Sequence, residues 1–486
     1  MSLLLPKSRR SMRGAVAVVV TLALVPLLLA AGAAVDYARA YLVQEQLLSA
    51  LDSTALAVAA ESDEDVAYLD ERAAEFFAES YDPSADAPAG DPQVEVASAR
   101  ITVSATATVP TYFLGLIGID QLTMQEDATA VRETKGLEVV LVLDTTGSMA
   151  YGGNMTAMRD AAEQLIRNLF GNKETPDNLR VSIVPFATAV NIGPSRTDLL
   201  KDYDPADFTE HEGTTWKGCV EARTYPDDVE DTTPAAGEKW PPYDWIPEPP
   251  DDACANPAES DDFDSYVDVD ETPAPTMGPN KGCGQPIKPF SNDRSQLLDK
   301  IAGLKAWDHG GTEAHLGMAW GMRMLSPKPP LTDTKAFDNP DWNKAIVVLT
   351  DGQNQLWLGD TGDDCEDQPD RAREGPYSPY GYALNNTRIL DSGDLSKSEG
   401  ARNDLINQAF DDRMLEVCNN IKAKASGDNA AEVFTITFKV SDHDTRDLFQ
   451  NCASAPDNYY NSPSNAELSD AFRAIGAKLR NLRLDR

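Results

Sequence analysis

Apolar residues are arranged along the chain in two ways, and each arrangement predicts a different kind of element. Short segments such as residues 138–144 and 344–350 are apolar at nearly every position, which is typical of strands buried on both faces of a parallel sheet. The segments between them carry apolar residues at helical spacing. From residue 137 to residue 485 the chain therefore predicts an α/β domain with a doubly wound, mostly parallel sheet. The predicted strands are residues 138–144, 179–187, 344–350 and 432–440, and the predicted helices are residues 154–169, 295–306, 312–325, 401–425 and 465–482.

Residues 15–34 form an apolar run without a charged side chain. About 20 helical residues at ~1.5 Å each cross a hydrocarbon core of ~30 Å, so this run predicts a transmembrane helix. Basic side chains precede the run, which predicts a cytoplasmic tail over residues 1–14 and a bulk that lies outside the cytoplasmic membrane. A cleaved secretory signal is the alternative, because residues 30–34 offer small side chains for cleavage, but the length of the run favours an anchor.

The helix is predicted to continue beyond the membrane, because residues 36–60 are rich in helix formers and contain no Gly or Pro. A second helix is predicted over residues 63–81, and the alternating sequence of residues 94–109 and 122–131 predicts strands. Residues 61–133 are thus expected to form a small region of helix and sheet.

Composition and charge narrow the possible partners. At 486 residues with 42% hydrophobic side chains, the chain has room for two or three domains with packed cores. Its formal net charge of −37 argues against a nucleic-acid partner, because a polyanion repels phosphate.

All six cysteines lie beyond the apolar run. An even number of cysteines in an oxidising compartment predicts three disulfides, for which fifteen pairings are possible. Cys418 on a predicted helix and Cys452 after the last predicted strand form the favoured pair. No cysteine or histidine spacing predicts a zinc site. The cysteines are Cys219, Cys254, Cys283, Cys365, Cys418 and Cys452.

Oxygen-bearing side chains gather where the predicted strands end. Asp144, Thr146 and Ser148 follow the first strand in one tight loop, Asp351 follows the strand of residues 344–350, and Thr312 opens an amphipathic helix. We expect the three segments to meet at one edge of the sheet. Carboxylates and hydroxyls suit a hard divalent cation, so the pattern predicts a site for Mg²⁺, with Mn²⁺ or Ca²⁺ as alternatives. The competing interpretation is that Asp144 and the hydroxyls only form a turn that caps the next helix.

The motif Asp144-x-Thr146-x-Ser148, completed by the distant Thr312 and Asp351, resembles the metal-ion-dependent adhesion site of the von Willebrand factor A domain. The resemblance implies a Rossmann-like fold and implies that these five residues form the metal site. Thr146 stands where many members have Ser, and this substitution keeps the hydroxyl.

Three N-terminal segments carry a second resemblance. They are Arg13-Gly14-Ala-Val-Ala, Gly32-Ala-Ala-Val-Asp36-Tyr37 and Leu51-Asp52-Ser-Thr-Ala-Leu-Ala-Val-Ala-Ala60. The segments resemble the TadE/TadG-like proteins of bacterial tight-adherence (Flp) pilus systems, in whose longer members this region, here residues 15–60, precedes a von Willebrand A domain. Smaller members are processed like prepilins after a Gly, but no Glu follows Gly14 closely, so we expect an uncleaved anchor. A helix followed by a small sheet is also a pilin-like layout.

Two insertions, at about residues 194–289 and 353–400, interrupt the predicted α/β domain. The first is acidic and rich in aromatic residues and cysteine, which predicts a loop-rich subdomain pinned by disulfides. If residues 189–192 form the antiparallel edge strand, this insertion leaves the end of the sheet opposite the metal. The second follows Asp351 and is expected to overhang the metal edge, where its aromatic side chains form either a local core or one wall of a ligand site. The aromatic residues are Trp216, Tyr225, Trp240, Tyr243 and Trp245 in the first insertion and Trp357, Tyr377, Tyr380 and Tyr382 in the second.

Three functions remain for a chain anchored in the bacterial cytoplasmic membrane with its bulk in the periplasm or at the cell surface. The favoured one is a component of a Tad-type pilus system, acting in assembly or adhesion, that binds other pilus proteins and a protein partner whose carboxylate reaches the metal. The second is a structural minor pilin whose metal only stabilises the fold. The third is a metal-dependent hydrolase. It is disfavoured because the chain has only four histidines and no recognisable catalytic motif. His309, beside the Thr312 segment, could approach the ion, but a general base also needs a positioned partner. We therefore expect no enzymatic activity.

Overall fold

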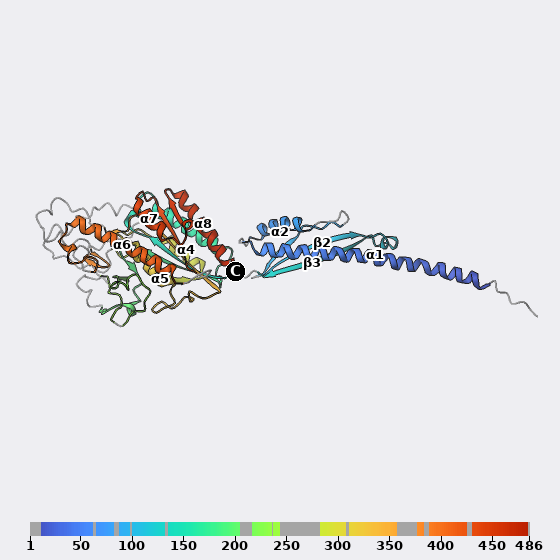
Figure 1. The fold of residues 1–486 in the computed structure, drawn as a ribbon, viewed down its shortest axis with the longest axis horizontal. Coiled ribbons are helices and arrows are strands. Elements are labelled where there is room, and N and C mark those ends of the chain that lie inside the picture. The colour runs from blue at the N-terminus through green and yellow to red at the C-terminus, as the bar shows by residue number, and fades with distance from the viewer. Residues whose placement is uncertain are drawn as a thin grey trace, which may run out of the picture. The chain divides into compact units, whose positions relative to one another are not determined.

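The computed structural model describes most of the chain and divides it into two compact units, residues 1–134 and residues 135–485 (Figure 1). The described residues are 11–61, 65–81, 87–97, 100–131, 135–204, 216–235, 237–243, 282–307, 311–356, 377–382, 388–424 and 430–484.

The first unit is built on one long helix, α1 (Ser11–Ala59), which confirms that the apolar run and the segment after it are a single helix. Among the described residues, α1 is the one helix long and apolar enough to cross a membrane, and the most apolar 18 residues of its segment Val19–Ala59 have a mean hydropathy of 2.1. A shorter helix, α2 (Val66–Ser80), follows and begins where the Asp65 carboxylate accepts hydrogen bonds from the amides of Ala67 and Tyr68.

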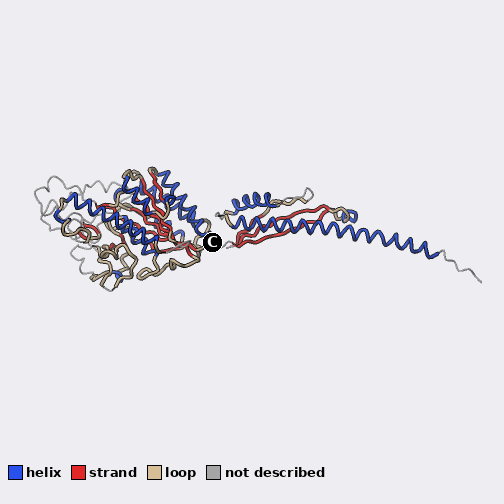
Figure 2. The backbone as a smooth tube through the Cα atoms, in the orientation of Figure 1, coloured by secondary structure: helices blue, strands red, loops and turns tan. Residues whose placement is uncertain are grey.

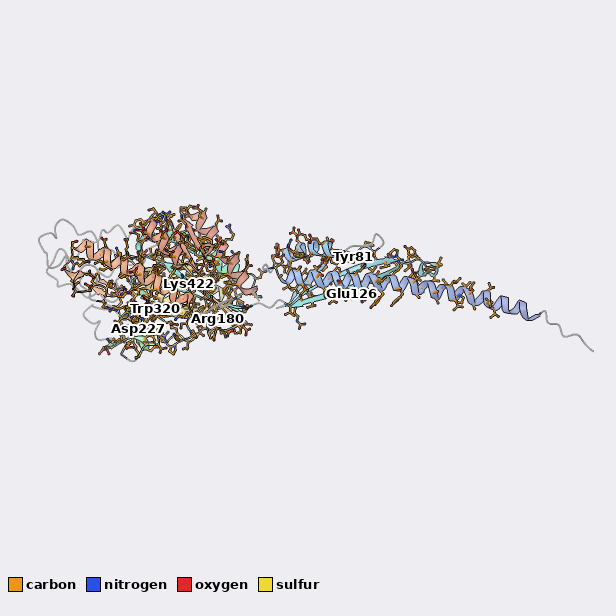
Figure 3. The ribbon with its side chains drawn as sticks, viewed as in Figure 1. Tyr81, Glu126, Arg180, Asp227, Trp320 and Lys422 are labelled. Atoms are coloured by element: carbon orange, nitrogen blue, oxygen red, sulfur yellow. A yellow bond between two sulfur atoms is a disulfide. The ribbon has the colours of Figure 1, made fainter. Side chains whose placement is uncertain are left out.

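An antiparallel sheet packs against α1 (Figure 2). Its strands are β1 (Gln93–Ala97), β2 (Arg100–Pro110) and β3 (Gln121–Val131). Residues 94–109, predicted to be strand, contain parts of two strands, because the chain turns back and pairs β1 with β2. Alternate residues of β2, from Ile101 to Val109, face the core with the buried half of α1. Glu126 on β3 lies beside α1 and accepts a hydrogen bond from Gln44 at 2.6 Å (Figure 3).

The second unit is a mixed α/β domain around a six-stranded sheet, as predicted. The strand order is β15-β14-β10-β4-β5-β8, and every pairing is parallel except that of β8 with β5. The strands are β4 (Gly136–Asp144), β5 (Leu179–Phe186), β8 (Lys288–Ser291), β10 (Trp342–Thr350), β14 (Glu432–Phe438) and β15 (Tyr459–Ser462). Short pairs outside the sheet are β6 (Val190–Asn191) with β7 (Cys219–Val220), β9 (Gly311–Thr312) with β11 (Gln355–Leu356), and β12 (Tyr377–Ser378) with β13 (Gly381–Tyr382). The helices are α3 (Asn154–Phe170), α4 (Arg294–Ala302), α5 (Ala314–Leu325), α6 (Glu399–Lys422), α7 (His443–Cys452) and α8 (Asn465–Leu484).

Helices cover both faces of this sheet, which explains why its central strands are apolar at every position. In β4, Leu137, Val139 and Leu141 face a core shared with α3, α4 and α8, whereas Val140 and Val142 face a core shared with α5, α6 and α7. The doubly wound arrangement predicted from the pattern is therefore confirmed.

The prediction of where the first insertion leaves the sheet is wrong, because the antiparallel edge strand is a different segment. Residues 189–192 do not pair with the sheet, because Val190–Asn191 pairs instead with Cys219–Val220 inside the insertion. The antiparallel edge strand is β8, in which Lys288 faces Ile183 and Ser291 faces Val181 of β5. The insertion therefore leaves and rejoins the sheet at the carboxyl end of β5, on the same edge as Asp144 rather than on the opposite one.

Two disulfides lie among the described residues of the second unit. Cys418–Cys452 joins α6 to α7, which confirms the favoured pair, and Cys219–Cys283 closes the first insertion. Cys254 and Cys365, the remaining cysteines, lie outside the described residues.

Asp231 ties the first insertion to the α/β core. It is 5% exposed and accepts hydrogen bonds from Ser326 (2.7 Å), Lys328 (3.0 Å) and Lys424. Burial by itself would raise the pKa of Asp231, but these hydrogen bonds outweigh burial and lower the pKa to about 2.

We expect Asp231→Asn to lower the free energy of unfolding at pH 7 by about 2 kcal/mol, because the ionised carboxylate is stabilised only in the folded state. Since the pKa is lowered on folding, this contribution is complete above the unfolded pKa, and the gap between the variant and the parent shrinks as the pH falls from about 4 towards 2. Urea unfolding across pH 3–7 measures the gap. Asp198→Asn, in an exposed pair with Arg196, is the control and should change stability by less than about 1 kcal/mol; a gap that widens in acid would contradict the assignment.

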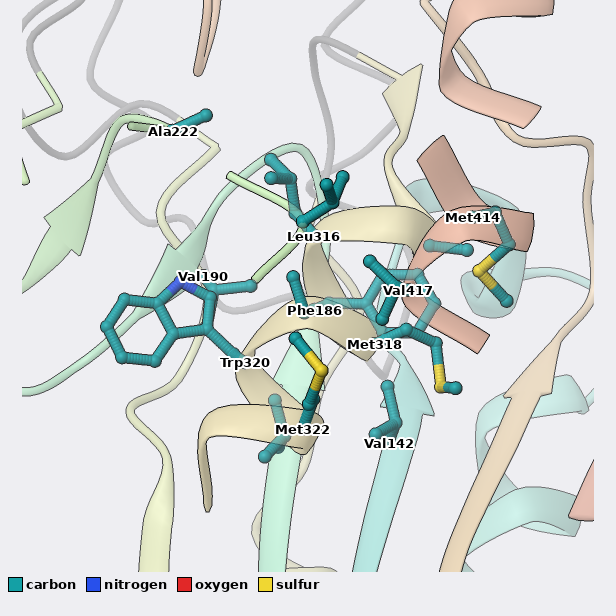
Figure 4. Packing of buried hydrophobic residues seen from close by; sticks show 14 of the residues in the cluster. Val142, Phe186, Val190, Ala222, Leu316, Met318, Trp320, Met322, Met414 and Val417 are labelled. Carbon is teal, nitrogen blue, oxygen red and sulfur yellow. The ribbon is translucent and has the colours of Figure 1, made fainter. Parts of the chain in front are cut away.

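Helix α5 lies unusually close to the sheet (Figure 4). A Cβ atom on Gly317 would lie 2.7 Å from the Phe186 ring and 3.0 Å from Val142, and one on Gly321 would lie 2.5 Å from Ile346. The two glycines allow a close approach that places the start of α5, next to Thr312, at the edge of the sheet.

We expect Gly317→Val to lower the free energy of unfolding by about 2–3 kcal/mol, because the added side chain overpacks the contact with Phe186. Chemical denaturation measures the change. Gly400→Val, on α6 with nothing within 4 Å of the added Cβ, is the matched control and should stay within about 0.5 kcal/mol of the parent. Equal losses in the two variants would show that backbone propensity, not the close approach, sets the effect.

Candidate metal site

The two predicted carboxylates lie at the carboxyl ends of neighbouring strands. Asp144 is the last residue of β4, and Asp351 follows Thr350, the last residue of β10. The two strands are parallel neighbours, with Leu143 paired to Leu349. The topology therefore places both side chains at the edge where α/β sheets bind ligands.

Asp144 is fully buried and bonded on both carboxylate oxygens. Oδ1 accepts hydrogen bonds from the Thr146 amide at 2.8 Å and from the Thr146 hydroxyl at 2.6 Å. Oδ2 accepts one from the Thr350 hydroxyl at 2.7 Å. The loop after β4 thus folds back on the carboxylate that begins it.

The other three predicted residues complete one cluster. The Thr146 and Ser148 hydroxyls lie 3.0 Å apart, and Ser148 donates to Asp351 Oδ1 at 2.5 Å. Thr312 lies close by, since a Cβ added to Gly352 would be 3.7 Å from Thr312 Oγ1 and 4.0 Å from Ser148 Oγ. The short pair of β9 and β11, in which Thr312 faces Gln355, holds Thr312 next to the segment after Asp351. All five predicted residues therefore converge.

Two further residues belong to this cluster and were not predicted. Asn154, the first residue of α3, donates to Asp351 Oδ2 at 2.8 Å and accepts from Lys439 Nζ at 2.7 Å. Lys439 follows the end of β14 in the left-handed conformation, with φ of 57°. Its place at the carboxyl end of a predicted strand is the signal that could have identified it.

Burial disfavours the charged forms of both acids, and the charge of Asp144 adds to this effect at Asp351. Burial raises the pKa of Asp144, although hydrogen bonds from Thr146 and Thr350 oppose the shift. Burial and the charge of Asp144 raise the pKa of Asp351 to about 7. A bound divalent cation would favour both ionised carboxylates, because it is the largest local charge in such a site.

The donor set fits a hard cation. Among the residues that the structure describes, no three His, Cys, Asp or Glu side chains form a group that could hold a metal, so hydroxyl oxygens would have to complete the shell. Thr146, Ser148 and Thr312 supply such hydroxyls beside the two carboxylates. Oxygen donors of this kind suit Mg²⁺, Mn²⁺ or Ca²⁺ rather than a thiolate-bound ion.

The aromatic residues of the insertions are mostly core residues where the structure describes them. Trp216, Trp240 and Tyr243 are at most 3% exposed. Tyr380, at 1%, donates to Asp228 at 3.1 Å and lies within hydrogen-bond distance of His315. Tyr225, in contrast, is 54% exposed. Trp245, Trp357 and the side chains of Tyr377 and Tyr382 lie outside the described residues.

Two histidines flank Thr312 in the sequence, His309 and His315, and the described part of the structure places neither of them next to Asp144 or Asp351. His309 lies outside the described residues. His315 is buried, bonds to Asn354 at 3.2 Å and stacks on Phe410 with ring centroids 4.5 Å apart. Burial lowers the pKa of His315 to about 3, so the ring is neutral and serves packing and hydrogen bonding between α5 and its neighbours.

The N-terminal segment matches a known family. Residues 14–61 match the model described as putative Flp pilus-assembly TadE/G-like. This match covers nearly all of α1. No curated protein sequence matches the chain.

The fold is similar to those of several solved structures. The vWF domain of the type V pili tip protein Mfa5 from Porphyromonas gingivalis is 11% identical, with 73% of this chain and 97% of that chain covered and a TM-score of 0.35. The pilus adhesin SpaC from Lactobacillus rhamnosus GG is 12% identical, and the match covers 81% of this chain and 34% of that chain with a TM-score of 0.34. A structure of proximal thread matrix protein 1 from the mussel byssus is 12% identical, and the match covers 72% of this chain and 46% of that chain with a TM-score of 0.30. In that structure the MIDAS motif is occupied by zinc.

Proposed function

We propose that this chain, whose N-terminal segment is TadE/G-like, is a membrane-anchored, extracytoplasmic component of a Tad/Flp-type pilus system that binds a protein partner through a divalent cation. It would act in pilus assembly or in surface adhesion. The observation that carries the proposal is the convergence of Asp144, Thr146, Ser148, Thr312 and Asp351 at one edge of the sheet.

The roles of the five residues follow from their chemistry. Asp144 and Asp351 would anchor or orient the ion, and the three hydroxyls would supply neutral oxygens. Mg²⁺ is the first candidate, with Mn²⁺ and Ca²⁺ as alternatives. Neutral donors leave a cation electron-poor, so a carboxylate from the partner becomes the strongest remaining ligand. Nothing in this scheme needs a general base, and we propose no enzymatic activity.

The membrane placement rests on α1 and on the charges around it. The apolar residues 15–34 would cross the cytoplasmic membrane, with the basic residues 1–14 in the cytoplasm and the second unit outside. Other pilus assembly proteins are the expected neighbours. No nucleic acid is expected as a partner, given the net charge of −37.

Shearing of intact cells tests where the chain acts. An antibody against the second unit should detect the chain either with the sheared fibres, as a displayed adhesin, or with the cytoplasmic membrane, as an assembly factor. Recovery of the chain as a soluble cytoplasmic protein would overturn the proposal.

A structural minor pilin remains a second candidate, because the raised pKa values of Asp144 and Asp351 indicate that a cation would also stabilise the fold. Both candidates expect Mg²⁺ to raise the melting temperature. Only the first expects capture of a pilus protein that is lost in EDTA. Capture that is unchanged in EDTA, together with metal-dependent melting, would favour the structural role.

A further inference from the structure

The turn between β2 and β3, residues 111–120, exposes a run of apolar side chains. Its first nine residues, Thr-Tyr-Phe-Leu-Gly-Leu-Ile-Gly-Ile, carry no charge, although 25% of the chain is charged, and the exposed Asp120 ends the turn before β3. Five large apolar side chains in it are exposed. They are Tyr112 (58%), Phe113 (41%), Leu116 (74%), Ile117 (59%) and Ile119 (43%). A contiguous exposed apolar surface of this kind marks an interaction site.

The turn is fixed to α1 at one level (Figure 1). The Asp36 carboxylate accepts hydrogen bonds from the backbone amides of Tyr112 (3.0 Å), Phe113 (2.8 Å) and Leu114 (2.9 Å). The Phe113 ring packs directly on Gly32, where an added Cβ would lie 2.3 Å from the ring. The turn therefore cannot slide along the helix without breaking this contact.

This level coincides with the end of the apolar run. Gly32 lies in the last turn of residues 15–34, and Asp36 is the first charged residue after the run. If α1 spans a bilayer, the turn is therefore held where the helix leaves the hydrocarbon core. Exposed Leu27 and Leu28 on α1 precede it, so apolar surface continues from the helix onto the turn.

The polar groups around the turn are those expected at a membrane interface. Tyr37 on α1 is 70% exposed and Tyr112 is 58% exposed, and tyrosine is enriched at the level of the lipid headgroups. The Arg39 guanidinium lies 4.2 Å from the Tyr112 ring centroid and donates to the Pro110 carbonyl at 3.3 Å. A long basic side chain in this place can keep its charge in the headgroup layer.

We infer that residues 111–119 insert into the outer interface of the membrane that α1 spans, as a second lipid contact beside the helix. The inference rests on the proposed membrane anchor. The occupant of the apolar surface is lipid, because the surface lies at the depth of the bilayer boundary and is continuous with the span.

Photo-crosslinking of the full chain tests the inference. The photoreactive residue p-benzoylphenylalanine replaces Leu116, Leu28 or Leu56 in turn, and each protein is reconstituted into phosphatidylethanolamine–phosphatidylglycerol vesicles, irradiated and analysed for lipid adducts by mass spectrometry. Leu28 reports on the anchor. Leu56, which is 62% exposed on the far part of α1, is the matched control for Leu116. We expect lipid adducts at Leu116 several-fold above those at Leu56.

The outcomes separate the inference from the proposed anchor. Adducts at Leu28 with only the Leu56 background at Leu116 would overturn the interfacial turn and leave the anchor standing. Crosslinks from Leu116 to a second copy of the chain would overturn it as well, because the surface would then be a protein interface. Loss of adducts at Leu28 would remove the anchor and the inference with it.

Discussion

Asp144→Ala is expected to reduce the affinity of the chain for Mg²⁺ by more than about a hundredfold and to abolish metal-dependent partner binding. Asp144 is the carboxylate around which the loop folds, since its oxygens accept hydrogen bonds from Thr146 and Thr350. Changing groups that only support ligands already costs about 10–100-fold in metal affinity, so loss of a ligand should cost more. Isothermal titration calorimetry of the purified protein measures the affinity.

The fold should survive this change, because the alanine also removes a buried carboxylate whose ionised form is disfavoured by burial. Asp293→Asn is the control, since it removes the same charge but keeps an oxygen to cap α4, near the amino end of β5 rather than at the carboxyl ends of the strands. It should bind Mg²⁺ as the parent does. Undiminished Mg²⁺ affinity in Asp144→Ala would mean that these residues do not hold the ion.

Glu138→Ala is expected to lower the free energy of unfolding by about 3–5 kcal/mol without changing the affinity for Mg²⁺. Glu138 is fully buried near the amino end of β4, where its carboxylate accepts hydrogen bonds from Lys344 Nζ at 2.5 Å and from Arg180 at 3.2 Å. Lys344 is 2% exposed, and burial lowers its pKa. Removal of Glu138 leaves this lysine buried without its charge partner, which is the costly state.

Two variants show whether the unpaired charge is the cause. The double variant Glu138→Leu with Lys344→Met removes both charges and should be less destabilised than Glu138→Ala alone. Glu163→Ala breaks an exposed pair with Arg167 and should cost less than about 1 kcal/mol. If the double variant were as unstable as the single one, lost packing rather than the unpaired charge would be the explanation.

The sequence was sufficient for the central strands and for the residues at their ends. Strands β4 and β10 are buried on both faces, so they appear as uninterrupted apolar runs, and Asp144 and Asp351 stand directly after them. Once both strands are placed in a parallel sheet, topology brings the two carboxylates to the same edge. Thr312 was predicted to join them from the resemblance to the metal-ion-dependent adhesion site, which includes a distant threonine.

The elements that sequence could not predict are those defined by pairing rather than by pattern. Strand β8 is four residues long, contains Pro289 and borders the sheet on one side only, so no alternation marks it. Strand β15, from Tyr459 to Ser462, is short and polar for a strand at the opposite edge. Asn154 joins the site only because Asp351, remote in sequence, is folded against the start of α3.

Residues 244–281, within the first insertion, form a loop whose two ends are held together. The Tyr243 amide donates to the Cys219 carbonyl at 3.0 Å, and Cys283 is bonded to the Cys219 sulfur. Both ends of residues 244–281 are thereby attached to a single residue. Because the free energy of closing a loop grows only slowly with its length, we expect changes in the length of this stretch to leave the register of the sheet unchanged.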